Sequence, residues 1–236
     1  IPEVVGPVTS ERTRDSEAWR FPLYCPACGL RLARVAGDAN TYCVNRACSA
    51  RVETGISHFT SRNAMDIEGL GERTVGALVS SGLVSDVGDL FALNKNALLD
   101  LLVSDSSNET LVNNLLNSID QARLRPLPNV LIGLGIEHLG PSAAELIARK
   151  FGNLERIANA GLDEIESLDG IGPVIAKSVA DFFSDSHNKF VIEKLQLNGV
   201  RLDVLEGEVD APQVLEGKSV VVTGSLEGWV VTRDEA

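Results

Sequence analysis

Apolar residues recur at helical spacing from about residue 63 to residue 200, and glycines interrupt the pattern at intervals. In Phe190-Val-Ile-Glu-Lys-Leu-Gln-Leu197 the spacing is typical of a helix that packs one face on a core. Val4-Val5 with Val8 predicts a short strand, and residues 215–224 predict a buried strand that ends in a glycine turn. The sequence therefore predicts a mainly α protein with short β pieces at both ends.

Glycine-centred turns divide the helical stretch into a repeat. The turns are Gly69-Leu-Gly71, Gly140 and Gly170-Ile-Gly172. The last two lie 32 residues apart, and the first ends 69 residues before the second, which is close to twice that spacing. A missing copy falls near residues 104–109, Ser-Asp-Ser-Ser-Asn-Glu, where Asn and Ser can replace glycine in a turn. We expect four units of about 33 residues, the second degenerate.

The residues of these turns suit a phosphate-binding hairpin. In Asp169-Gly-Ile-Gly-Pro-Val174 two glycines flank one apolar residue, and the proline suits the first turn of a new helix. The apolar residue would plug the core, while the glycines permit a tight turn and a close approach of the backbone. Outward N–H groups and the helix dipole would then form an anion site that is blind to base identity. The alternative is a helical repeat whose glycines serve only as turns.

Three such turns in register predict sequence-independent binding of duplex DNA. In the third turn His138 stands where the first glycine would be, and Pro141 opens the next helix. Polar or charged side chains follow the turns within one helical turn and can assist the backbone amides. The residues expected to contact DNA are Gly69, Gly71, Arg73, Thr74, Gly140, Ser142, Gly170, Gly172 and Lys177.

All the cysteines lie between residues 25 and 48, as Cys25-Pro-Ala-Cys28 and, after fourteen intervening residues, Cys43-Val-Asn-Arg-Ala-Cys48. Two close pairs at this separation predict a structural zinc site with four-cysteine ligation. Four thiolates leave no open position for water, so the zinc would hold the fold and perform no catalysis. Two disulfides or free thiols are the alternative. The surrounding arginines would either touch phosphates or form a solvated surface; they are Arg31, Arg34, Arg46, Arg51 and Arg62.

The distribution of charge along the chain limits how it could bind DNA. The formal net charge is −12, divided into +2 over residues 1–62 and −14 over residues 63–236. The acidic portion has no general positive field, so it would have to use backbone N–H groups and a few placed cations. Hydrophobic residues make up 44% of the 236 residues, enough for a core and for two or three domains. No apolar run of membrane-spanning length and no signal peptide are recognisable, so no membrane partner is expected.

Several of these stretches resemble the NAD-dependent DNA ligases of bacteria. Phe21-Pro-Leu-Tyr-Cys-Pro-Ala-Cys-Gly29 looks like the start of that family's four-cysteine zinc finger. His58-Phe-Thr-Ser-Arg-Asn-Ala-Met-Asp-Ile-Glu-Gly-Leu-Gly71 looks like its junction between the finger and the first helix-hairpin-helix unit. Leu134-Gly-Ile-Glu-His-Leu-Gly140 and Asp169-Gly-Ile-Gly172 look like its third and fourth hairpins. Leu215-Glu-Gly-Lys-Ser-Val-Val-Val-Thr-Gly-Ser-Leu226 looks like the opening of its BRCT domain.

The resemblance implies an order of domains along the chain. Ile1-Pro-Glu-Val-Val-Gly-Pro7 looks like the end of the family's OB fold. The expected divisions are the end of the OB fold at 1–16, the four-cysteine zinc finger at 17–62, a helix-hairpin-helix domain of four units at 63–205, an acidic linker at 206–214 and a truncated start of a BRCT domain at 215–236.

The resemblance also implies a function. The whole enzyme takes AMP from NAD onto a lysine, passes it to the 5′-phosphate at a nick, and seals the strand through attack by the 3′-hydroxyl. This stretch would be its module for nicked double-stranded DNA in replication and repair, located in the bacterial cytoplasm at the nucleoid. No Lys-x-Asp-Gly adenylation motif occurs here. The stretch should therefore hold no catalytic residue and be inactive alone, with structural zinc, while missing catalytic domains bind NAD and magnesium.

Two other interpretations remain open from the sequence. One is a stand-alone repair adaptor without ligase activity, such as a recombination mediator that also combines a helix-hairpin-helix with a four-cysteine zinc site. In such a mediator a single helix-hairpin-helix normally precedes the zinc site. The opposite order here, with several hairpins after the cysteines, favours the ligase. The other is a zinc-stabilised interaction scaffold with no role in nucleic-acid binding. The partner of the BRCT segment is not identified by the sequence.

Overall fold

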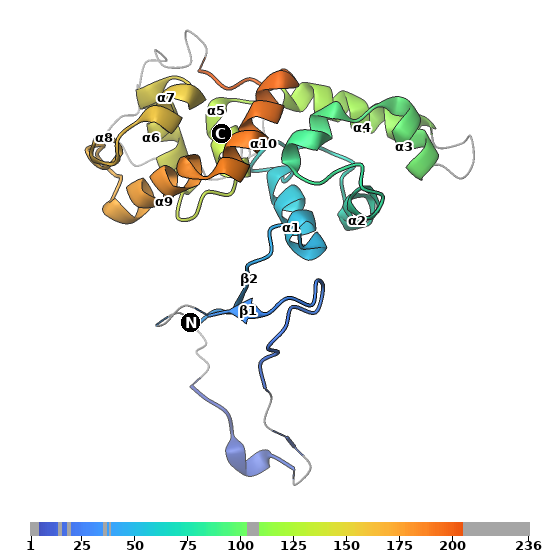
Figure 1. The fold of residues 1–236 in the computed structure, drawn as a ribbon, viewed down its shortest axis with the longest axis vertical. Coiled ribbons are helices and arrows are strands. Elements are labelled where there is room, and N and C mark those ends of the chain that lie inside the picture. The colour runs from blue at the N-terminus through green and yellow to red at the C-terminus, as the bar shows by residue number, and fades with distance from the viewer. Residues whose placement is uncertain are drawn as a thin grey trace, which may run out of the picture.

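The structure, a computed structural model, describes residues 5–13, 16–17, 20–34, 37, 39–102 and 109–204. A helical body and a small cysteine-rich finger make up the described chain, and helix α1 (Ser49–Phe59) joins them (Figure 1). The predicted mainly helical class is confirmed. The linker predicted at 206–214 and the strand predicted at 215–224 lie outside the described residues.

The β structure near the N-terminus belongs to the finger. Strands β1 (Leu32–Ala33) and β2 (Tyr42–Cys43) pair antiparallel, with Leu32 opposite Cys43. The strand expected at Val4, Val5 and Val8 is not formed by the described residues 5–8, which precede a short 3-10 helix, η1 (Thr9–Glu11). Val5 is 96% exposed, and a strand needs hydrogen-bonded partners that the described residues do not offer there.

The helical body has two hydrophobic cores. The first is formed by α1, the first two units and the last helix, and the second by units three and four. Leu134 and Leu202 pack against both cores and join them. The elements of the first core after α1 are α2 (Glu72–Ser80), η2 (Val87–Ala92), α3 (Lys95–Leu102), α4 (Glu109–Ala122) and α10 (Ser186–Leu197). Those of the second are α5 (Leu127–Gly133), α6 (Pro141–Phe151), α7 (Leu154–Asn159), α8 (Leu162–Glu166) and α9 (Pro173–Ser184).

Local signals set the helix ends of the second core. Pro141 and Pro173 stand in the first turns of α6 and α9, where a missing N–H costs nothing. Gly152 ends α6 in the left-handed conformation, at φ 75°. The side chain of Asn153 then caps α7 by accepting a hydrogen bond from the backbone N–H of Arg156 at 2.8 Å. The predicted helix starts at these prolines are confirmed.

The last helix returns to the first core and locks onto η2. Val191 and Leu195 are buried there, and Lys194 donates to Asp86 and Asp89 at 2.7 and 2.6 Å. Burial opposes these charges, but the hydrogen bonds and the opposite charges outweigh it, so the pKa of Lys194 is raised and that of Asp89 is lowered. The close approach of α10 also explains Gly88, because a Cβ there would lie 2.6 Å from the Cβ of Lys194.

Gly88→Ala is expected to lower the free energy of unfolding by about 1–3 kcal/mol, because the new methyl group forces η2 and α10 apart. Urea denaturation measures this effect. Gly76→Ala is the matched control, since Gly76 lies in the middle of α2 with open space around its Cα. Alanine there should instead stabilise the protein by about 0.5–1 kcal/mol. Equal midpoints for the two variants would contradict the packing argument.

Among the described residues, none of the helices has both the length and the apolar character needed to cross a membrane.

Candidate metal centre and nucleic-acid interface

The four cysteines of the finger converge on one point. The sulfurs of Cys25 and Cys48 are 3.8 Å apart, those of Cys28 and Cys43 are 3.6 Å apart, and all four lie within 4.8 Å of one another. These distances exclude disulfide bonds, whose sulfurs lie about 2.05 Å apart. Tetrahedral zinc with bonds of about 2.3 Å would place its sulfur ligands about 3.8 Å apart. The donor set and its spacing therefore fit a zinc ion.

Electrostatics favour a cation at this point. The backbone N–H of Leu30 and the side chain of Asn45 lower the pKa of Cys28 to about 6. At Cys43 the backbone N–H of Asn45 lowers the pKa, but burial and the other three sulfurs outweigh it and raise the pKa to about 12. Four thiolates cannot share this space without a positive ion, and zinc supplies that charge.

Local backbone geometry presents the sulfurs. In the first knuckle the N–H of Gly29 donates to the carbonyl oxygen of Cys25 at 2.8 Å, and Gly29 has a φ of 71°, which favours glycine. In the second knuckle Cys48 is the N-cap of α1. The helix that begins on this ligand buries Ile56 and Phe59 in the first core. Because α1 serves both parts, the finger is anchored to the helical body.

The three glycine hairpins share one backbone conformation. Their first positions, Gly69, His138 and Gly170, have φ values of 90°, 63° and 87°. The residue two positions later is in each case the N-cap of a helix in an extended conformation, with φ between −70° and −91°. The interpretation of His138 as the replacement for a first glycine is therefore confirmed, since it adopts the left-handed conformation that glycine favours.

The middle residue of each hairpin is a core plug, as expected. Leu70, Leu139 and Ile171 are exposed by only 8%, 9% and 6%. The hairpins also rest on neighbouring units in equivalent ways. A Cβ on Gly69 would lie 3.5 Å from Leu115 in α4, and one on Gly170 would lie 3.2 Å from Leu146 in α6. Units one and two thus form one pair, and units three and four form another.

The second glycines have no internal reason to be glycine. Gly71, Gly140 and Gly172 have ordinary φ values, and a Cβ added at any of them would meet nothing within 4 Å among the described residues. No side-chain hydrogen bond caps the described helices that begin at these glycines. Their first backbone N–H groups remain available to an external acceptor. An open, methyl-free surface over helix N-termini is the geometry that a close-approaching phosphate requires.

The second, degenerate hairpin is predicted near residues 104–109. The described parts of helices α3 and α4 end at Leu102 and begin at Glu109. Residues 103–108 lie outside the described residues.

The polar side chains expected to assist the hairpins have different surroundings. Arg73 is exposed and has no hydrogen bond or ion pair within the described chain, so it is available to a phosphate. Thr74 is half-buried and Ser142 is exposed. Lys177 forms an exposed ion pair with Asp181 one turn later, which reduces its contribution to a positive field. Among the described residues, these side chains therefore offer few free cations beside the hairpin amides, in keeping with the negative net charge.

Several of the finger arginines have internal roles. Arg34 donates to the carbonyl oxygen of Ala39 at 2.9 Å. Arg51 donates to the carbonyl oxygen of Cys43 at 2.9 Å and supports the second knuckle. Arg46 forms two hydrogen bonds with Asp185, at the start of α10. Of these, the contact between Arg46 and Asp185 joins residues that are 139 positions apart.

Another long-range group was not recognisable from the sequence. Arg125 and Asn129 donate to the carbonyl oxygen of Ala64 at 3.2 and 3.0 Å, and Arg125 also reaches the carbonyl oxygen of Arg62. These bonds fix the turn that leads from α1 to the first hairpin. They cannot be read from local spacing, because the partners are more than 60 residues apart.

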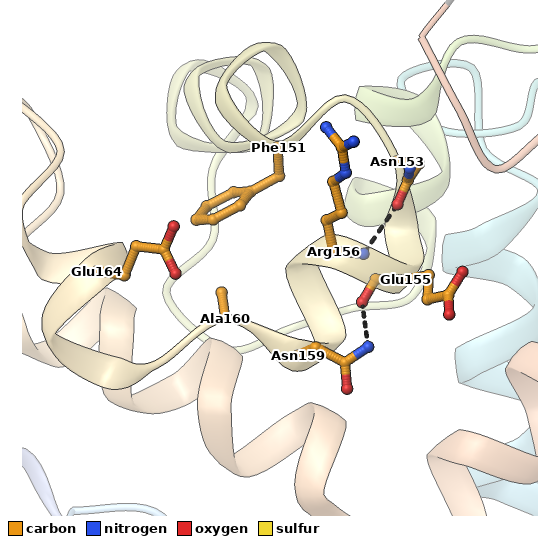
Figure 2. A pocket seen from close by; sticks show the side chains of 7 residues that line it. All are labelled: Phe151, Asn153, Glu155, Arg156, Asn159, Ala160 and Glu164. Atoms are coloured by element: carbon orange, nitrogen blue, oxygen red, sulfur yellow. Dashed lines mark hydrogen bonds between the residues drawn. The ribbon is translucent and has the colours of Figure 1, made fainter.

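A surface hollow of about 570 Å³ beside α7 has a different character. Figure 2 shows side chains that line it, among them Phe151, Ala160, Glu155, Arg156 and Glu164. Its polar amides are engaged in helix capping, since Asn153 accepts from the N–H of Arg156 and Asn159 donates to the carbonyl oxygen of Glu155. Two carboxylates would repel a phosphate, so this hollow does not extend the hairpin surface.

Comparison with known proteins agrees with this description. Residues 24–50 match the family described as the NAD-dependent DNA ligase C4 zinc finger domain. Residues 129–192 match a helix-hairpin-helix motif family. Both matches fall on parts of the chain whose geometry is described above, the cysteine finger and the third and fourth hairpins.

Several curated relatives align with almost the whole of this chain. It is 43% identical to a DNA ligase of Symbiobacterium thermophilum over 97% of this chain and 34% of the relative. It is 42% identical to a DNA ligase of Chloroflexus aggregans over 100% and 34%, and to one of Lactobacillus delbrueckii subsp. bulgaricus over 96% and 33%. The chain thus spans about a third of the length of the curated relatives it matches. With its zinc finger and its helix-hairpin-helix repeats, the chain belongs to the NAD-dependent DNA ligase family.

Proposed function

We propose that this chain is the sequence-independent duplex-binding part of an NAD-dependent DNA ligase that seals nicks in replication and repair. The observation that carries the proposal is the repeated geometry of the hairpins that end at Gly71, Gly140 and Gly172. At each of these glycines an added Cβ would meet nothing within 4 Å among the described residues, and no side chain caps the helix that follows. Helix N-termini bind anions through backbone N–H groups, and phosphate contacts carry no base information.

The remaining contacts fit the same proposal. Gly69, Gly170 and the residue in the equivalent position, His138, make the tight turns, and Arg73, Thr74, Ser142 and Lys177 lie within one turn of the open amides. The zinc is structural and holds the finger to which α1 is attached. Chemistry on NAD, with magnesium, belongs to other domains of the longer ligase, and this part alone is inactive. The ligase would act at nicked DNA in the bacterial cytoplasm, at the nucleoid.

Titrating fluorescent nicked duplexes of unrelated sequence with the protein over a range of salt concentrations tests the proposal. We expect equal affinities for the different sequences and a linear fall of log affinity with log salt. The slope should be shallow, about −2, because neutral amides supply most contacts and each cation that meets a phosphate contributes about −0.9. Failure to bind any duplex at low salt, or strong preference for one sequence, would overturn the proposed function.

A further inference from the structure

Arg46 connects the metal loop to the far end of a hairpin helix. It lies between Cys43 and Cys48, in the loop that the metal would hold. Its Nη1 and Nη2 atoms donate to the two carboxylate oxygens of Asp185 at 2.5 and 2.6 Å. A paired contact of this kind fixes orientation as well as distance, because the planar guanidinium matches the carboxylate.

Asp185 lies at the junction of α9 and α10, so its contact with Arg46 acts on the end of α9. It is at once the C-cap of α9 and the N-cap of α10, where its side chain also accepts from the N–H groups of His187 and Asn188. Its hydrogen bond from Arg46, together with these backbone bonds, holds the pKa of Asp185 well below its usual range, so the pair stays charged. Helix α9 begins at the other end with Gly172, the amide site of the fourth hairpin. Twelve residues of helix, about 18 Å long, therefore separate Arg46 from that hairpin.

Packing does not replace this contact. Arg46 and Asp185 both line a cleft of about 640 Å³, together with residues of α1, η2, α9 and α10. The side chains of Arg46 and Asp185 are 53% and 27% exposed, and such pairs contribute about 0–1 kcal/mol to stability. The ion pair is therefore partly exposed at the edge of a cleft, and its loss should leave the protein folded.

We propose that Arg46 is a positioning residue for duplex binding: its ion pair with Asp185 couples the finger to α9 and sets the direction in which the fourth hairpin presents its amides. Arg46 acts from the opposite end of the helix and does not itself bind phosphate. The inference rests on the proposed function, because the fourth hairpin, which Arg46 would orient, is one of the phosphate-binding sites proposed there.

Two single variants and their combination test the coupling. Arg46→Gln removes the charge, and Asp185→Asn removes it from the partner while keeping a good N-cap for α10. Each should weaken nicked-duplex binding by about fivefold, and the double variant should be no weaker than either one. Arg46→Lys should recover part of the loss, because it restores a single charged contact. Melting temperatures and zinc content should match those of the wild type.

Backgrounds with one hairpin disabled separate positioning from a general structural effect. In a Gly172→Val background Arg46→Gln should have no further effect on affinity, whereas in a Gly71→Val background it should still cost about fivefold. Equal losses in both backgrounds would overturn the assignment to the fourth hairpin.

The salt dependence of duplex affinity distinguishes this positioning role from the opposing explanation, in which Arg46 contacts a DNA phosphate directly. In that case Asp185→Asn would free the arginine and leave affinity unchanged or higher, and Arg46→Gln would make the salt slope shallower by about one unit. Either result would overturn the positioning role, as would Arg46 variants that bind like the wild type. If the wild-type protein binds no duplex, the proposed function fails and this inference fails with it.

Discussion

Cys48→Ser is expected to abolish stoichiometric zinc binding and to unfold the finger, while the helical body keeps its structure. Serine cannot supply the fourth thiolate, and zinc binding in such fingers contributes about 10–16 kcal/mol of apparent free energy that a small segment cannot replace with a core. The first core still holds Ile56 and Phe59 of α1, so loss of structure should stop near the start of that helix. Metal analysis and hydrogen exchange over residues 20–48 measure the two effects.

Ala47→Ser is the matched control, because it places the same hydroxyl group one residue before the ligand on an exposed side chain. It should retain one zinc per chain and normal protection from exchange. Wild-type protein that is purified in reduced form and contains no zinc would contradict the metal assignment. So would full protection of the finger in Cys48→Ser.

Gly172→Val is expected to weaken nicked-duplex binding by about tenfold or more without unfolding the protein. The side chain fits in the free protein, since a Cβ at this position would meet nothing within 4 Å among the described residues and φ is −91°. It would, however, stand between the backbone amides and a phosphate. Each lost hydrogen bond to a charged group costs about 1.5–3 kcal/mol, and 1.4 kcal/mol corresponds to tenfold in affinity. Gly71→Val should behave alike, and the double variant should bind more weakly still.

Gly161→Val controls for the change of helix cap. Gly161 is the N-cap of α8 in a similar extended conformation, with open space around it, but it belongs to none of the Gly-x-Gly hairpins. The variant should pay the same small capping penalty and bind DNA normally. Fluorescence anisotropy gives the affinities and thermal melting gives the stabilities. Normal affinity in folded Gly172→Val protein would remove the hairpin from the interface.

Features that depend on neighbouring residues were predictable from the sequence. The two cysteine pairs predict the convergence of four sulfurs, because knuckle geometry follows from short spacings. The hairpins at Gly69–Gly71 and Gly170–Gly172 were recognisable because two glycines flank one apolar residue before a helix, and the third was recognisable from Gly140 and Pro141. The backbone of His138 followed from its register in the repeat alone. DNA contact by these residues remains a prediction.

Features that depend on distant partners were not predictable. Arg46 and Asp185, or Arg125 and Ala64, meet only after the helices pack, and no local pattern marks them as pairs. Gly88 has no turn to explain it, since its small size serves the approach of α10. The β propensity of Val5 and Val8 gave a wrong strand over the described residues, because propensity acts only where a neighbouring strand completes the hydrogen bonds.

The way in which the turns at Gly69 and Gly170 rest on a helix of an adjacent unit limits how this architecture can vary in evolution. Removing unit four would take away the turn that Leu146 contacts, and removing unit one would do the same to Leu115. A lone unit would therefore expose an apolar surface that no solvent-facing residue is placed to cover. Ligases whose affinity for DNA changes through duplication or deletion of hairpin units should therefore gain or lose these units in pairs.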